Sequence, residues 1–425
     1  MTLSTTDTPS GVRSAGWALA VLGVVTLAVV AFSTPWSVLP EGAPAVVPDP
    51  VRDFTAEQIA RAERFDALVS LPGYLSLGLT LLVAGVLVAT PLGARLVDRL
   101  PGRWWLRALL GVLALSVAVA ILRWPLGMWS ESYLREFGLS TQTWPAWAAD
   151  RAKSTGIGTA LTAIMVLAVI ALARRYRRWW IPAAAGAFVL TVAASFAYPV
   201  LIEPVFNDFR PLEAGRLRDD LLAMATRDGV PVENVLVADA SRRTTALNAY
   251  VSGFGATRRI VVYDTLLRAP ADEVELVVAH ELGHAKAGDV LSGTLVGGLG
   301  AAFGACLLYA VTSAGVVRRR TEIASLGDPR AVGLVMGLLS LATVLSGPAQ
   351  NLVSRQIEAR ADVHALDLTR DPATFVAMQK RLAATNISDL SPDLVEYVLY
   401  ASHPTTPQRI ALARTWAALN GLPEP

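Results

Sequence analysis

The motif His-Glu-x-x-His at residues 280–284 is the part of the sequence best suited to chemistry. On a helix, side chains four residues apart project from one face, so the imidazoles of His280 and His284 point the same way. Two neutral imidazoles in this arrangement can hold one Zn²⁺ at about 2.0–2.1 Å. Glu281 lies beside them and is placed to take a proton from water at the metal. The motif therefore predicts a zinc centre with a general base.

The scarcity of histidine argues against a chance pair of histidines on a surface helix. The chain has 4 histidines in 425 residues, and none of them precedes His280. Asp272, Glu273 and Glu275 come shortly before the motif, where carboxylates suit the positive end of a helix. We therefore interpret the segment 271–289 as a helix that carries two metal ligands.

A later polar segment offers the third ligand that the motif lacks. Glu358 and Asp362 are four residues apart in SRQIEARAD and share a helix face. Glu358 can complete the ligand set, and Asp362 can accept the free N–H of a ligating histidine. The alternative is an ordinary charged helix with Arg355 and Arg360 as ion-pair partners. Spacing alone leaves both interpretations open.

The two remaining histidines have different settings. His364 lies about 600° around the helix from Glu358 and is interpreted as a bystander. His403 lies in the proline-rich turn SHPTTPQRI, ahead of a predicted helix. A histidine on a turn can donate to a developing oxyanion, or it can be held by local hydrogen bonds alone. The residues themselves do not decide between these two roles for His403.

The elements that position these residues are predicted to be membrane helices. The chain is 53% hydrophobic and 17% charged, with a mean hydropathy of +0.46. Its net charge of +2 is uninformative, but no basic patch with interleaved aromatics suggests a nucleic-acid partner. Its one cysteine, Cys306, excludes an intrachain disulfide and a cysteine-based zinc site. About 20 apolar residues are enough to cross a lipid bilayer, and seven uncharged runs are candidates to do so. They are residues 14–40, 67–94, 108–122 with its flanks, 154–173, 179–202, 290–317 and 331–354.

The predicted spans divide the chain into four parts. Residues 1–202 form an N-terminal membrane domain of five spans with a polar loop at 41–66, residues 203–289 carry the histidine motif, residues 290–354 form two further spans, and residues 355–425 carry the third ligand. Within the loop, a polar helix capped at Thr55 with Gln58 three residues on is expected.

The first polar part is also expected to contain a small β-hairpin. The segments 234–239 and 259–263 are predicted as its strands, with Gly253 and Gly255 in the turn between them. The helix of the histidine motif is expected to run through Asp289 into the sixth span.

Five stretches of the sequence resemble the type I CaaX prenyl endopeptidases and their bacterial heat-shock membrane protease relatives. These proteins are gluzincin zinc metallopeptidases of the membrane. The resemblance implies a mainly α, multi-pass bundle with a gluzincin-type catalytic domain, one Zn²⁺ per chain and a peptide or protein substrate. The five stretches are residues 203–212, 247–267, 354–362 and 402–410 and the motif helix. Residues 135–144 are also similar to the family's N-terminal membrane region, so the resemblance covers most of the chain from about residue 50 onward.

Eight residues match functional positions of that family. The zinc ligands of the family are matched by His280, His284 and Glu358, and its general base is matched by Glu281. Asp362 matches the carboxylate behind a ligand, and His403 and Arg409 match a turn that stabilises the tetrahedral intermediate. Asn248 matches a residue that holds the substrate backbone. Asp208 and Leu247 depart from the family's usual residues, which affects the expected substrate preference and not the chemistry.

Two other classes of protein fit the sequence less well. An intramembrane zinc protease carries its motif inside a spanning helix, whereas charged residues flank this motif on both sides. A non-catalytic zinc-binding membrane receptor or transporter accounts for the spans and the metal, but it has no use for Glu281. An integral-membrane zinc metalloendopeptidase acting on membrane-associated or C-terminal peptides is therefore the main prediction.

The cellular setting is predicted from composition and charge. Basic residues are almost all arginine, which together with many alanines and valines indicates a high-GC bacterium and its plasma membrane. If all seven runs span, the arginine-dense loops near 95–103, 174–178 and 318–330 share one side of the membrane. The positive-inside rule places that side in the cytoplasm and the catalytic residues outside. The family resemblance implies the reverse, so the two arguments disagree on orientation.

Overall fold

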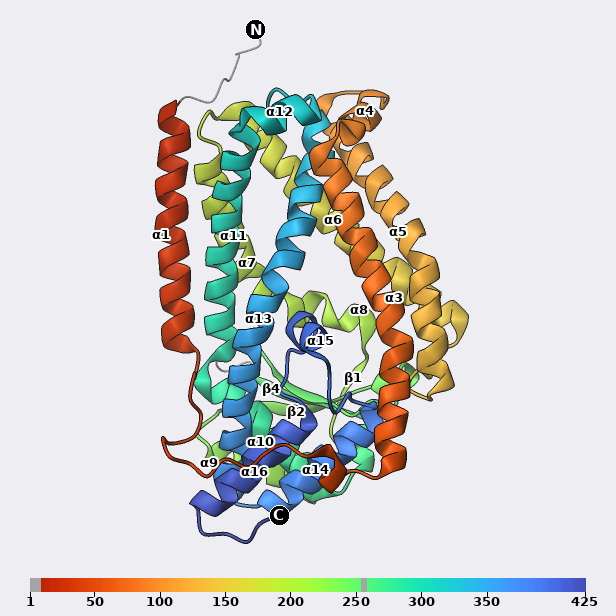
Figure 1. Cartoon of the computed structure of the whole chain (residues 1–425), viewed down its shortest axis with the longest axis vertical. Helices are drawn as coiled ribbons and strands as arrows, with labels where there is room; N and C mark the ends of the chain where they lie inside the picture. The colour runs from red at the N-terminus through yellow and green to blue at the C-terminus, as the bar shows by residue number, and fades with distance from the viewer. Residues whose placement is uncertain (1–8, 254–257) are drawn as a thin grey trace.

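Seven long helices dominate the computed structural model, which describes residues 9–253 and 258–425 (Figure 1). Each contains an apolar stretch long enough to cross a bilayer, in agreement with the seven predicted runs. The mainly α, multi-pass architecture is thereby confirmed. The seven are α1 (Pro9–Ser33), α3 (Ala56–Ala89), α5 (Trp104–Glu136), α6 (Trp144–Arg175), α7 (Trp180–Leu201), α11 (Asp289–Ser313) and α13 (Val332–Thr369).

The third span is longer than its uncharged run. That run ends before Arg123, but α5 continues without a break as a helix of 33 residues, with Pro125 inside it. Arg123 is exposed in the middle of this helix. A charged residue therefore ends the uncharged run without ending the helix, and the third run belongs to a helix of full spanning length.

Two of the long helices extend beyond their apolar stretches toward the end of the bundle that contains the β-sheet and the histidine motif (Figure 1), which is called the catalytic end below because the sequence predicts catalysis there. Thr55 and Gln58 form a capping box at the start of α3, as predicted, and the helix then runs through the polar segment into the second span. Similarly, α13 carries the seventh apolar run and the polar segment of Glu358 in one helix. A single helix therefore contains both the seventh predicted membrane span and the predicted third metal ligand.

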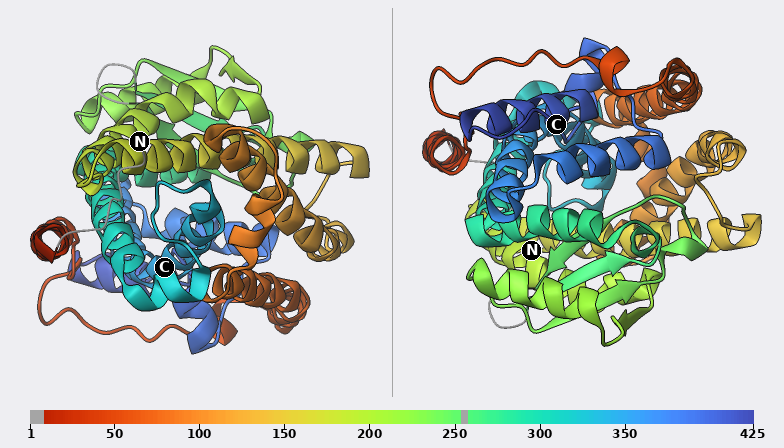
Figure 2. Two further views of the ribbon diagram at one scale, coloured as in Figure 1. Left: turned by 90° about the horizontal axis from the view of Figure 1, so that it is seen from above. Right: turned by 90° about the horizontal axis from the view of Figure 1, so that it is seen from below.

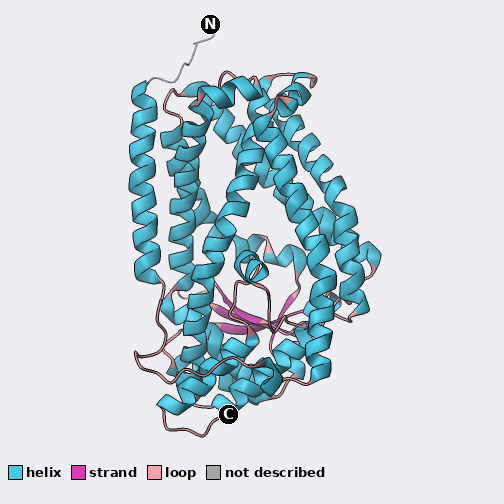
Figure 3. Ribbon diagram, viewed as in Figure 1, coloured by secondary structure: helices cyan, strands magenta, loops and turns pink. Residues whose placement is uncertain are grey.

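A four-stranded sheet lies at the catalytic end (Figure 3), with strand order β1-β2-β4-β3. The strand β2 (Asn234–Ala238) pairs antiparallel with β1 (Phe209–Pro211) and parallel with β4 (Arg259–Tyr263), and β4 pairs antiparallel with β3 (Ala249–Ser252).

The predicted pairing within this sheet is therefore wrong. Both predicted strands exist, but they are parallel neighbours, and the hairpin partner of β4 is β3. Residues 239–258 between them are long enough for the crossover connection that parallel strands require. Gly253 follows β3 as expected, and Gly255 lies outside the described residues.

The helix α10 (Ala271–Ala287) is central to the catalytic end, and most of its residues are buried. The edge strand β3 and α9 (Arg216–Arg227) pack on one side of it, and α13 and α14 (Pro372–Asn386) pack on the other (Figure 2). Gly288 ends α10 in a left-handed conformation with φ 72°, and α11 starts at Asp289. The expected continuous helix into the sixth span is therefore wrong, because a glycine at this position terminates the helix and redirects the chain.

The catalytic end and the opposite end of the bundle each have a hydrophobic core of their own. Val262, Leu282 and Phe375 belong to the first, and Val112 and Tyr309 belong to the second. The shorter helices lie around these cores and are α2 (Pro50–Asp53), α4 (Leu92–Asp98), α8 (Glu203–Phe206), α12 (Gly315–Thr321), α15 (Leu394–Leu399) and α16 (Thr406–Leu419).

Candidate metal centre

Three predicted ligands converge between α10 and α13. His280 Nε2 lies 3.1 Å from Glu358 Oε2 and 3.2 Å from His284 Nε2. His284 Nε2 lies 3.6 Å from Glu358 Oε1. Ligands on a tetrahedral zinc with bonds of about 2.0–2.1 Å are about 3.3 Å apart, so these separations fit one zinc ion. Three protein ligands leave the fourth position for water or substrate, as in catalytic zinc sites.

Close packing of the two helices brings Glu358 to the histidines. A Cβ at Gly283 would lie 3.0 Å from the Cβ of His364, so only glycine allows this contact without displacement. His364 itself contacts Asp228, with Nε2 3.0 Å from Oδ2, and it lies outside the ligand grouping. Its role is therefore in helix packing beside the site.

Asp362 contacts the ring nitrogen of His280 that faces away from Glu358. Its Oδ1 lies 2.9 Å from His280 Nδ1, and its side chain is fully buried. Arg409, from α16, donates to both carboxylate oxygens over 2.5 and 2.8 Å. An Nδ1–H donated to the carboxylate leaves Nε2 unprotonated and available to a metal. The ion-pair partner of Asp362 is thus Arg409, and not Arg355 or Arg360, which the sequence offered as partners.

His284 has a matching carboxylate that the sequence reasoning missed. Its Nδ1 lies 2.8 Å from Asp289 Oδ2, and Asp289 in turn pairs with Arg360. A carboxylate five residues onward reaches back in this way because Gly288 ends the helix between them. The sequence did contain a signal for this contact, because a glycine that can end the helix is followed directly by an aspartate just after the motif.

The electrostatics of the centre suit a cation. Burial lowers the pKa of His284, but hydrogen bonds to Asp289 and Glu358 outweigh this effect and raise it to about 10. Burial raises the pKa of Glu281, whereas the neighbouring imidazoles and the N–H of Val251 oppose the shift. The carboxylates around the two histidines therefore favour positive charge where the ligand atoms meet.

His403 reaches the centre from the turn before α16. Its Nε2 lies 3.2 Å from Glu358 Oε2, and its Nδ1 lies 2.9 Å from Ser402 Oγ. Arg355 donates to the carbonyl oxygens of Tyr397 and Ala401 and so holds the segment that leads to this turn.

Asn248 lies apart from the ligand atoms. It is exposed at the start of β3, and its Oδ1 accepts from the N–H of Ala249 over 2.9 Å. Its position directly before the edge strand β3, which packs on α10, is compatible with contact to an extended peptide.

A second grouping of possible ligands exists among the described residues. Asp66, Asp389 and Glu396 bring carboxylate oxygens within 4.8 Å of one another. The grouping contains no histidine, and its members are half-buried, so it resembles a cluster of surface acids more than a zinc site.

Comparisons with known proteins identify the family. Residues 211–417 match the model of peptidase family M48, and residues 62–208 match that of the CAAX prenyl protease N-terminal region, described as five membrane helices. The uncharacterized metalloprotease YhfN of Bacillus subtilis is 31% identical over 376 residues, which cover 86% of each chain. The chain belongs to peptidase family M48.

Other similar proteins carry more specific names. The CAAX prenyl protease 1 homolog of Arabidopsis thaliana is 31% identical, over 64% of this chain and 65% of its own. CAAX prenyl protease 1 of Saccharomyces cerevisiae is 28% identical, over 67% of each chain. The crystal structure of S. mikatae Ste24p has a TM-score of 0.74 at 21% identity and covers 96% of this chain and 99% of its own, which establishes the shared fold.

Membership in M48 makes this protein a membrane metalloprotease, and it implies a bound metal. The predicted family and enzyme class are confirmed. Nothing in the comparisons supports the alternative of a non-catalytic receptor or transporter.

Proposed function

We propose that this M48 protease is a zinc metalloendopeptidase in which His280, His284 and Glu358 hold the metal. The observation that carries this proposal is the convergence of the three ligand atoms from α10 and α13, each within 3.6 Å of the next. Asp362 and Asp289 hold the outer nitrogens of the two imidazoles, the usual arrangement behind zinc-binding histidines. Nitrogen and oxygen ligands in this number favour zinc over calcium or magnesium.

The residues around the metal have distinct roles in the proposed hydrolysis. Bound zinc polarises the scissile carbonyl and lowers the pKa of water toward ~7. Glu281 takes a proton from the attacking water and later gives it to the leaving amine. His403 donates to the oxyanion of the tetrahedral intermediate. Arg409 acts with it indirectly, because its guanidinium holds Asp362 and thereby the ring of His280.

The substrate is proposed to be a membrane-associated or C-terminal peptide bound in extended form. The strand β3 is the edge of the sheet and packs on α10, so its outer backbone groups lie near the centre. An extended peptide beside β3 gains main-chain hydrogen bonds, and Asn248 at the start of the strand can hold its backbone. Relatives named CAAX prenyl proteases support action on C-terminal peptides.

The variant Glu281→Gln tests the proposal directly. The amide cannot accept a proton, whereas the metal ligands stay in place, so kcat should fall by about 10²–10⁴-fold. Cleavage of a fluorogenic peptide in detergent, with zinc content measured on the same samples, separates catalysis from metal binding. Turnover within a few-fold of wild type would exclude Glu281 as the base. Glu275→Gln, on the same helix outside the site, is the matched control.

Physiological substrates can be found with the same pair of proteins. Mass spectrometry of membrane-protein fragments from cells with wild-type or Glu281→Gln protein should show C-terminal fragments that depend on Glu281. An identical fragment pattern in the two strains would refute action on membrane proteins under those conditions.

A further inference from the structure

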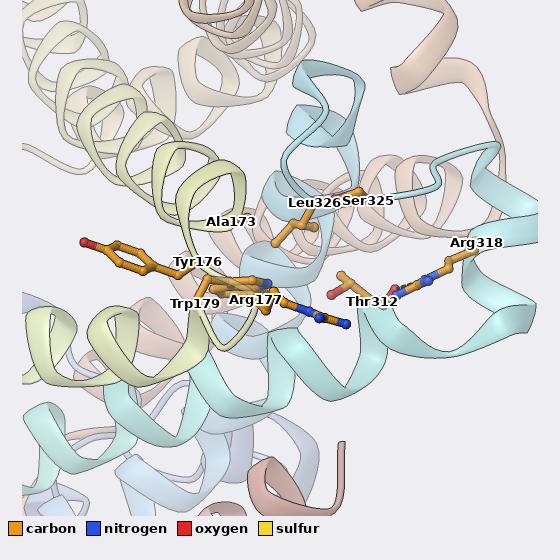
Figure 4. Close-up of a pocket in the computed structure, with 8 residues that line it drawn as sticks. All are labelled: Ala173, Tyr176, Arg177, Trp179, Thr312, Arg318, Ser325 and Leu326. Atoms are coloured by element: carbon orange, nitrogen blue, oxygen red, sulfur yellow. Dashed lines mark hydrogen bonds between the residues drawn. The ribbon is translucent and has the colours of Figure 1, made fainter. Parts of the chain in front are cut away.

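Side chains that hold backbone groups of another segment occur at both ends of the bundle. At the end opposite the metal centre, beside the recess shown in Figure 4, Arg318 of α12 donates through its Nε to the carbonyl oxygen of Thr312 in α11 over 3.0 Å. At the catalytic end, Asn386, the last residue of α14, holds Leu247, which precedes β3 by two residues. Of these two contacts, the second adjoins the strand beside which the substrate is proposed to bind.

The amide of Asn386 makes both of the hydrogen bonds that a neighbouring strand would make to Leu247. The N–H of Leu247 donates to Oδ1 of Asn386 over 2.9 Å, and Nδ2 donates to the carbonyl oxygen of Leu247 over 3.2 Å. An asparagine side chain can do this because it carries a donor and an acceptor, as a peptide group does. Two hydrogen bonds to one residue fix the orientation of its backbone as well as its position.

The residues on either side of Leu247 face the opposite way. The carbonyl oxygen of Asn248 accepts from the N–H of the last residue of β4 over 3.0 Å, and that of Ala246 accepts from a hydroxyl that follows β4 over 2.7 Å. Because backbone groups alternate in direction along an extended strand, those of Leu247 and Ala249 face the open edge of the sheet. Asn386 therefore occupies one end of the edge along which the proposed substrate lies.

The helix that carries Asn386 is attached to the helix of the histidine motif. Arg381, also in α14, donates two hydrogen bonds of 2.5 and 3.0 Å to the carboxylate of Glu273 in α10. Directly after Asn386, Ile387 takes a left-handed conformation with φ 52°, which β-branched residues rarely adopt, and its side chain is buried in the hydrophobic core of the catalytic end. The ion pair and the core together set the position of Asn386 relative to α10 and its metal ligands.

We propose that Asn386 is a positioning residue for the substrate, because it fixes the start of β3 relative to the metal ligands. Its contact with Leu247 orders the backbone beside Asn248 before any peptide arrives, so binding does not include the entropy cost of that ordering. Without the amide, this cost is subtracted from the binding free energy of an extended peptide, whereas the metal ligands are unchanged. The inference rests on the proposed binding of the substrate beside β3.

The test compares wild type with Asn386→Ala on fluorogenic peptides that are lengthened by one residue at a time from either end. In wild type, KM should fall as the peptide grows along β3. In Asn386→Ala, we expect KM for the longest peptides to rise about 10-fold, the effect of two hydrogen bonds that contribute about three-fold each, with kcat and zinc content little changed. Asn386→Asp keeps the acceptor for the N–H of Leu247 but loses the donor, so its KM should be intermediate.

Asn420→Ala is the matched control. It removes an asparagine that also makes two hydrogen bonds, with Arg370 and with the carbonyl oxygen of Trp416, at the end of α16. Its KM should equal that of wild type at every peptide length. If thermal denaturation shows that Asn386→Ala does not fold, Asn386→Asp supplies the same comparison with one bond retained.

The possible results separate this inference from the proposed function. A KM that is independent of peptide length in wild type would refute binding along β3, and the role of Asn386 with it. A wild-type length dependence that persists unchanged in the Asn386 variants would overturn the role of Asn386 and leave the proposed function standing. A loss of kcat and zinc as large as the rise in KM would also overturn it, because that pattern indicates a general loss of structure.

Discussion

Replacement of Asp362 by alanine should weaken metal binding and destabilise the protein through two separable effects. The carboxylate has no exposed surface, contacts His280 Nδ1 at 2.9 Å and accepts two hydrogen bonds from Arg409. Loss of the carboxylate behind a ligating histidine costs about 10–100-fold in metal affinity. Loss of one partner of a buried ion pair costs about 3–5 kcal/mol, because the other charge stays buried without compensation.

The two effects can be measured on the same samples. A zinc competition titration gives the affinity, and thermal denaturation of the metal-free protein in detergent gives the stability. In Asp362→Ala/Arg409→Met both buried charges are absent and an apolar chain fills the space, so stability should largely return while metal affinity stays low. Glu322→Ala breaks the exposed pair with Arg95 and should cost at most about 1 kcal/mol. Wild-type zinc affinity in Asp362→Ala would refute the role of Asp362 in orienting His280.

Three other outcomes test the ligand set, the oxyanion donor and the orientation. His284→Ala should lose nearly all zinc by metal analysis, and full stoichiometry would contradict its assignment as a ligand. His403→Ala should keep its zinc but lose about 10²–10³-fold in kcat, the usual effect of removing one oxyanion donor, and an unchanged kcat would leave the role unsupported. A cysteine at Glu233 in a Cys306→Ser background should react with an impermeant thiol reagent in intact cells, because the arginine-rich segments at the opposite end are expected in the cytoplasm. Reaction only after lysis would reverse this orientation.

The structure bears on that last expectation through the third span. The charge argument requires all seven runs to cross, and the third had only 15 uncharged residues before Arg123. Because α5 is one helix of 33 residues, the segments that contain α4 and α12 lie at one end of the bundle and the sheet lies at the other (Figure 1). The arginines therefore share an end, as the argument assumed.

Local patterns in the sequence were sufficient to predict the spans and the two histidine ligands, whereas the family resemblance was needed to assign Glu358 as the third ligand. The thickness of a bilayer sets the length of an apolar run, so hydropathy located all seven helices. Helical periodicity placed His280 and His284 on one face, and the same spacing related Glu358 to Asp362. These features depend on residues only a few positions apart.

Features that depend on tertiary contacts were not predictable in this way. Asp289 contacts His284 only because the chain turns at Gly288, and Arg409 contacts Asp362 only because α16 packs on α13. The parallel pairing of β2 and β4 depends on a crossover that no short window of sequence reveals. Strand pairing and buried ion pairs are properties of the packed domain.

Because α13 is long, the accurate placement of Glu358 depends on a second helix contact close to the candidate metal centre. Gly333 and Gly93 cross closely at the far end, where a Cβ on Gly333 would lie 2.8 Å from the Cα of Gly93. Glu358 lies 25 residues, or about 37 Å, further along the helix, so a tilt of only about 2° would move it by about 1.3 Å. Metal–ligand distances tolerate about 0.2 Å. The glycine crossing alone is therefore an insufficient constraint, and the second contact, His364 against Gly283 just beyond Glu358, holds the ligand in register with the histidines.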